Sequence, residues 1–174
     1  MTMHRRLRNA SALAAALSVC CGTPAEPVPE FRYVASHACS NVLAYTWSEP
    51  LTEYLVVWAD VMHLGMALGS TRTFAVASAG DDLKIQVDMY RQPALDLYCS
   101  DVKVDQELTV WRATSGKVTI ALPTNPDNDR SVLYSDYRVV VTVTNLVLQG
   151  PRRQRVSIAG PITLTGQAGG NPFG

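Results

Sequence analysis

Strict alternation of apolar and polar residues is the feature that most constrains the fold of this chain. It is cleanest over residues 83–90, where every second side chain is apolar. This two-residue period predicts a β-strand with one face on a core and one face in water. We therefore expect Leu83, Ile85, Val87 and Met89 to point into a hydrophobic core.

The second half of the chain predicts further strands. Residues 117–122 alternate in the same way, and Ser115-Gly116 is expected to open that strand. Residues 137–148 form a long β-branched run whose nearly continuous apolarity is typical of a central strand buried on both faces. After a Gly-Pro turn, residues 155–158 and 162–165 are expected to return as antiparallel partners of the long strand.

The first half is less regular. Residues 41–47 alternate and predict a strand, and residues 71–77 predict a further short one. Residues 53–62 are rich in β-branched and aromatic side chains, which favours a strand. An amphipathic helix over residues 51–68 is the alternative, since four large apolar residues would share one helical face.

These segments together predict an all-β protein. About seven to nine strands separated by regular turn residues favour an antiparallel β-sandwich of immunoglobulin-like or jelly-roll type over alternating βαβ units. The length suits one core. We expect a single β-sandwich domain over residues 31–166, followed by a flexible Gly/Pro-rich tail over residues 167–174.

The first twenty residues have the character of an export signal. A basic start containing Arg5, Arg6 and Arg8 precedes an apolar run over residues 10–19, the arrangement of a secretory signal peptide. The run is about half as long as a membrane-spanning helix requires. A cytosolic chain with an apolar N-terminal helix is the alternative.

Residues Leu17-Ser18-Val19-Cys20 resemble the lipobox of bacterial lipoproteins, with Val19 departing from the small residue usual there. The resemblance implies a signal peptide over residues 1–20, cleavage before Cys20 and lipidation of that cysteine. Residues 21–30 would then be a Pro-rich tether, since proline favours extended chain. Simple secretion after cleavage behind Ala25 is the alternative. Durable anchoring requires more than one acyl chain.

Two cysteines, Cys39 and Cys99, lie in the body of the chain. In an oxidising compartment, two cysteines in a small domain most simply pair, so we predict a disulfide between them. The alternative makes Cys39 a nucleophile, because His37 would lie on the same strand face. No cysteine and histidine spacing typical of a structural zinc site is present.

Charge argues against a nucleic-acid partner. The chain has 15 basic and 15 acidic residues, and removal of the signal would leave an acidic excess, whereas nucleic-acid binding needs a basic surface. Arg152, Arg153 and Arg155 cluster in a predicted turn, which we interpret as solvated rather than as a phosphate clamp.

Catalytic motifs are scarce. His37 and His63 are the two histidines outside the export region, and the sequence has no nucleophile elbow, zinc-protease motif or phosphate-binding loop. Carboxylates could pair across a cleft, as a glycosidase requires. The candidates are Asp60, Asp88, Asp101, Asp105 and Glu107.

The best metal candidate is an acidic segment. Asn125, Asp127, Asp129 and Asp136 fall at the first, third, fifth and twelfth places of an EF-hand-like loop, where oxygen ligands would suit calcium. Arg130 stands where that loop needs glycine. The same residue types also form turns, which is the alternative.

Two aromatic residues are candidates for stacking on sugar rings. The alternation at residues 83–90 turns Tyr90 outward, and Trp111 lies in weakly patterned sequence. The alternative is that tryptophans in apolar strands belong to the core.

These observations give three functional hypotheses. The first is a non-catalytic binding or structural module of the cell envelope, carried on a lipid anchor and facing an unknown envelope protein or glycan. The second is a carbohydrate- or calcium-dependent adhesion module. The third is an envelope hydrolase, which would need a pocket that holds His37 or His63 beside a carboxylate and a nucleophile. Calcium is the only cofactor that the sequence suggests.

Overall fold

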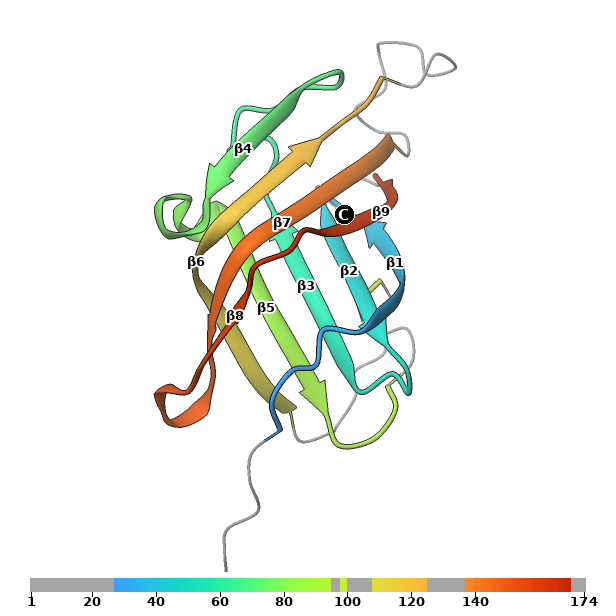
Figure 1. Ribbon diagram of the computed structural model, residues 1–174. Helices are drawn as coiled ribbons and strands as arrows, with labels where there is room; N and C mark the ends of the chain where they lie inside the picture. The colour runs from blue at the N-terminus through green and yellow to red at the C-terminus, as the bar shows by residue number, and fades with distance from the viewer. Residues whose placement is uncertain (1–26, 95–97, 100–107, 125–136, 170–174) are drawn as a thin grey trace, which may run out of the picture.

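A computed structural model describes residues 27–94, 98–99, 108–124 and 137–169. The described residues form nine β-strands and three short 3₁₀ helices (Figure 1). The strands are β1 (Tyr33–Cys39), β2 (Leu43–Ser48), β3 (Glu53–Ala59), β4 (Thr71–Ala75), β5 (Leu83–Tyr90), β6 (Leu108–Ala121), β7 (Tyr137–Gln149), β8 (Arg155–Ile158) and β9 (Ile162–Ala168). The 3₁₀ helices are η1 (Val76–Ser78), η2 (Gly80–Asp82) and η3 (Pro151–Arg153).

All nine strands belong to one antiparallel sheet. The hydrogen-bonded order is β1-β2-β3-β5-β6-β7-β8, with β4 added to β6 and β9 added to β7. The sheet curls into a half-barrel, and β7 and β9 pass in front of β3 and β2 (Figure 1). The predicted all-β antiparallel class is confirmed, whereas the finer prediction of a two-sheet sandwich is not.

The curl depends on a bend in the two longest strands, β6 and β7. The first half of β6 pairs with β5 and its second half with β4, and the β6–β7 register shifts on both sides of Ser115. Gly116 lies at this bend with φ +134°, and a Cβ there would come 2.7 Å from Leu146 Cδ2. Only glycine fits this backbone. The prediction that Ser115-Gly116 opens a strand is therefore wrong, because these residues form a bulge inside β6.

The two ends of the curled sheet meet where β9 crosses β1. The Ser36 hydroxyl donates to the Thr165 carbonyl and accepts from the Thr165 amide, each at 2.9 Å. A Cβ on Gly166 would lie 2.3 Å from the Ala38 nitrogen. The glycine therefore allows the backbones of β1 and β9 to come into direct contact.

The core lies inside the curl. Leu83, Ile85 and Val87 are buried there, and Met89 packs against their cluster, which confirms the predicted inward face of β5. The prediction that residues 137–148 are buried on both faces is wrong. Burial alternates along β7, because its inward residues contact the core while its outward ones lie on an uncovered face.

The strands also decide several other predictions made from the sequence. Residues 53–59 form a strand, so the helical alternative for residues 51–68 is wrong. β8 and β9 both pair with β7, as predicted. β9 continues through Ala168, two residues past the predicted end of the domain. Residues 1–26, which contain the predicted signal, and residues 170–174 lie outside the described part of the chain.

The contact between β9 and β1 can be tested at Gly166. We expect Gly166→Ala to destabilise the protein by about 1–3 kcal/mol, because the added methyl group forces the two backbones apart. Gly160→Ala is the matched control, since nothing lies within 4 Å of a Cβ at that position. Urea unfolding measures both variants. Equal stability of the two would contradict the proposed close approach.

Candidate functional site

The outer face of β2, β3 and β5 carries a cluster of aromatic side chains. We call this cluster the aromatic face, and it consists of Tyr45, Trp47, Tyr54, Tyr90 and Tyr98. Strand register explains the arrangement, because Trp47 pairs with Tyr54 and Tyr54 with Asp88. Along each strand these residues alternate with the core residues, so their side chains lie on the opposite face of the sheet.

Ring contacts hold the aromatic face together. The centroid of Tyr98 lies 5.2 Å from that of Tyr45 and 5.5 Å from that of Tyr54. Tyr90 meets Tyr54 edge to face at 5.8 Å, and Trp47 lies 5.7 Å from Tyr45. Tyr45 and Tyr54 are buried, whereas Trp47, Tyr90 and Tyr98 are half-buried. The cluster therefore has a packed interior and a partly accessible rim.

The segment after β5 is fastened over this face at two points. Cys99 forms a disulfide with Cys39 of β1, which confirms the predicted pair and brings Tyr98 onto the sheet. Ala94 donates its amide to the Leu51 carbonyl and accepts a hydrogen bond from the Tyr54 hydroxyl. Ala94, Tyr98 and Cys99 therefore cover part of the outer face, where sequence alternation predicted water.

Asp88 lies beneath this cover and is only 2% exposed. Gln86 Nε2 donates to both of its carboxylate oxygens at 2.9 Å, and the Tyr98 hydroxyl donates to Oδ2 at 2.5 Å. Burial raises the pKa of Asp88, against the lowering effects of Tyr98, Gln86 and Arg112. Burial also raises the pKa of Tyr98, and the nearby Asp88 carboxylate adds to this effect. Asp88 is therefore enclosed, and both of its carboxylate oxygens have hydrogen-bond partners within the protein.

The two predicted stacking residues have different outcomes. Tyr90 lies on the outer face, at the rim of the aromatic face. Trp111 is fully buried in the core, and Gly150 packs so closely on its ring that a Cβ there would clash at 2.5 Å. Trp111 therefore cannot stack on a ligand. In β6 the even-numbered Val118 and Ile120 point inward after the bulge, whereas the odd-numbered Trp111 points inward before it. A strand without the bulge would have turned Trp111 outward.

The two histidines are far less enclosed than a hydrolase requires. His63 Nδ1 lies 3.2 Å from Asp60 Oδ2 and 3.5 Å from Asp82 Oδ1, but its side chain is 74% exposed. The amide of His63 also donates to Asp60, which lowers the pKa of that carboxyl group. His37 packs edge to face on Tyr45. This surface arrangement gives the hydrolase hypothesis no support.

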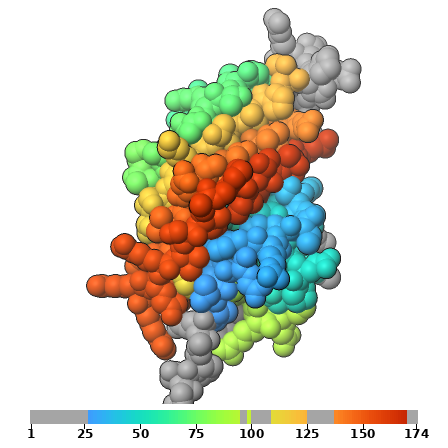
Figure 2. All heavy atoms as spheres, viewed as in Figure 1, coloured from blue at the N-terminus to red at the C-terminus, as the bar shows by residue number. Residues whose placement is uncertain are grey.

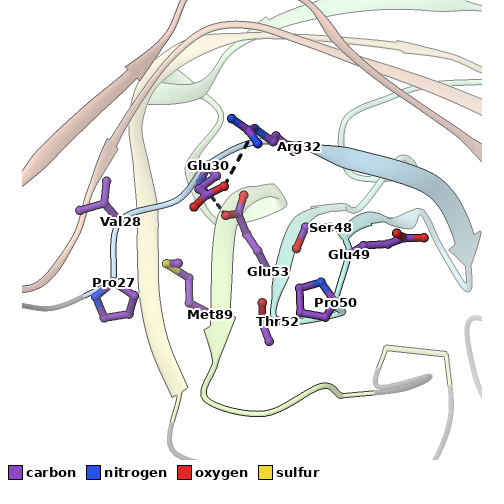
Figure 3. Close-up of a pocket in the computed structure, with 10 residues that line it drawn as sticks. All are labelled: Pro27, Val28, Glu30, Arg32, Ser48, Glu49, Pro50, Thr52, Glu53 and Met89. Atoms are coloured by element: carbon purple, nitrogen blue, oxygen red, sulfur yellow. Dashed lines mark hydrogen bonds and ion pairs between the residues drawn. The ribbon is translucent and has the colours of Figure 1, made fainter.

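A cavity of about 400 Å³ opens where the N-terminal segment crosses the end of the sheet (Figure 3). The buried Glu53 carboxylate accepts hydrogen bonds from the amides of Glu30 and Phe31, at 2.7 and 2.9 Å. Pro27, Val28 and Arg32 line the cavity from that same segment. Because both carboxylate oxygens hold the backbone, we assign Glu53 a structural role.

The predicted calcium site lies entirely outside the described residues. Asn125, Asp127, Asp129 and Asp136 all lie in residues 125–136, which the structure does not describe. Among the described residues, no group of three or more histidine, cysteine, aspartate or glutamate side chains could hold a metal ion.

Comparison with known proteins adds no relative. No family model, curated protein or solved structure matches the chain. Within the part of the chain that is described, no helix is long and apolar enough to span a bilayer.

The buried carboxylate predicts a pH dependence. Because the folded-state pKa of Asp88 is raised, the wild type is most stable below the unfolded-state pKa and loses stability as pH rises through the folded-state pKa. Between these two pKa values, we expect the stability of Asp88→Asn relative to wild type to increase with pH. The increase is about 1.4 kcal/mol for each tenfold difference between the acid dissociation constants of Asp88 in the unfolded and folded states. Urea unfolding from acidic to neutral pH measures this difference. A relative stability that decreases as pH rises would contradict it.

Proposed function

We propose that the protein is exported, carries lipid at Cys20 and works at the cell envelope as a non-catalytic binding module. The observation that carries the proposal is the disulfide between Cys39 and Cys99. Such bonds persist in oxidising compartments and are rare in reducing ones. The disulfide therefore supports export from the cytosol, which the basic and apolar N-terminus predicts from sequence alone.

The aromatic face is the binding surface that we favour, with its accessible rim formed by Trp47, Tyr90 and Tyr98. Side chains with an apolar body and a polar tip are enriched at interfaces because they contact apolar and polar groups together. The partner in this proposal is an envelope protein. Calcium dependence stays a separate proposal that rests on residues 125–136.

A carbohydrate ligand is the second candidate, and one observation favours it. Tyr90 and Tyr98 place two half-buried rings side by side, with their hydroxyl oxygens 3.2 Å apart. Sugar recognition uses such a combination of ring faces and polar atoms. Together with this candidate we keep the proposal of a two-sheet sandwich, an architecture found in lectin domains.

The lipid anchor is tested by labelling cells with a palmitate analogue and measuring intact mass. We expect wild type to begin at Cys20 and to carry label, because the thiol at that position accepts the lipid. Cys20→Ser should carry none. Cys21→Ser is the matched control and should label like wild type. Label that persists in Cys20→Ser would overturn lipidation at this residue.

The sugar candidate is tested by titrating soluble chito- and peptidoglycan oligosaccharides while tryptophan fluorescence is recorded. We expect Trp47→Ala and Tyr90→Ala each to weaken binding about fivefold, since stacking contributes about 1 kcal/mol. Trp58→Ala is the control, because Trp58 lies on the outer face with Lys84 over its ring and outside the aromatic face. No binding by wild type, or equal losses in all three variants, would reject this candidate.

A further inference from the structure

One end of the molecule gathers the N-terminal segment and an arginine-rich turn. We call it the lead end, and it comprises residues 27–32, the β2–β3 turn, residue 91 and residues 150–155, which form the β7–β8 turn and begin β8 (Figure 1). The hydrogen bonds from Glu30 and Phe31 to Glu53 fix the first of these segments at the start of β3. The direction from which the chain enters the domain is therefore set by the fold.

The described part of the lead end is basic. Its arginines are all exposed, and they are Arg32, Arg91, Arg152, Arg153 and Arg155. Its described acidic residues are Glu30, Glu49 and Glu53, of which Glu53 is buried and bonded to backbone amides. Figure 2 shows the β7–β8 turn, in orange, projecting outward from the lower left of the molecule. Arg152 and Arg153 of this turn, and Arg155 at the start of β8, are therefore exposed close together in the chain.

The backbone of the turn holds two of them in an unfavourable conformation. Arg152 and Arg153 have φ of +51° and +61°. This left-handed region disfavours side chains other than Asn, Asp and Gly. Two arginines therefore occupy backbone positions that better suit other residue types, and strained residues concentrate at functional sites.

The position of the proposed anchor gives this charge a partner. If lipid is attached at Cys20, only residues 21–26 separate it from Pro27, and six residues span at most about 20 Å. The lead end then stays close to the bilayer, where attraction between basic groups and anionic lipid acts over roughly 10 Å.

We propose that the lead end binds the headgroups of an anionic phospholipid bilayer through Arg152, Arg153 and Arg155, and that it orients the domain with the aromatic face beside the membrane rather than facing it. The inference rests on the lipid anchor proposed above. Because the mature chain carries more acidic than basic residues, general attraction would not bring it to an anionic surface. A localised basic surface is needed for binding.

The test uses the mature chain, residues 20–174 with Cys20→Ser, secreted through a cleavable signal so that no lipid is attached. It is sedimented with phosphatidylcholine vesicles, with and without phosphatidylglycerol. We expect binding only when phosphatidylglycerol is present. Arg153→Gln should weaken binding about fivefold, the contribution of one basic residue near such a surface. Arg138→Gln, which replaces an exposed arginine at the start of β7, should leave it unchanged.

Two further results decide the proposal. The double variant Arg152→Asn/Arg153→Asn should bind about 25-fold more weakly, while its melting temperature is unchanged or higher because asparagine tolerates positive φ. Three results would overturn the proposal. They are no binding of wild type to anionic vesicles, an equal loss of binding in Arg138→Gln, and release of the protein from vesicles by inorganic phosphate at constant ionic strength. These outcomes do not depend on lipidation, which palmitate labelling tests separately.

Discussion

The disulfide between Cys39 and Cys99 is the interaction on which most of the account depends. It joins positions 60 residues apart, and closing such a loop stabilises the fold by about 4 kcal/mol in the chain-entropy treatment. It also positions Tyr98, the neighbour of Cys99, against Tyr45, Tyr54 and Asp88. The same bond therefore supports the proposed destination and builds the candidate site.

The bend of β6 and β7 determines the rest of the architecture. Because the bulge at Gly116 reverses which residues face inward, one pair of strands contributes to both the front and the back of the curled sheet. β9 can then reach β1, and the core is enclosed without a covering helix among the described residues. The outer face of β2, β3 and β5 remains available for the aromatic face, while the β7–β8 turn projects at the lead end.

Sequence reasoning succeeded where the pattern was local. Alternation predicted the inward face of β5, and residue type predicted that β8 and β9 return to β7. It failed where tertiary contacts override the pattern. The bulge beside Gly116 reversed the orientation of Trp111, and Tyr98 buried Asp88 on a face expected to be wet. The predicted disulfide could have indicated that second contact, because Cys99 must bring its neighbour onto the sheet.

The most direct test of the central claim is the oxidation state of Cys39 and Cys99 in protein isolated from its native compartment. Cells are quenched with acid, denatured protein is alkylated without reductant, and peptides are identified by mass. The account predicts that the peptides containing Cys39 and Cys99 remain joined and become alkylated only after reduction. Full alkylation of both thiols before reduction would contradict the disulfide, the placement of Tyr98 that depends on it and the support for export.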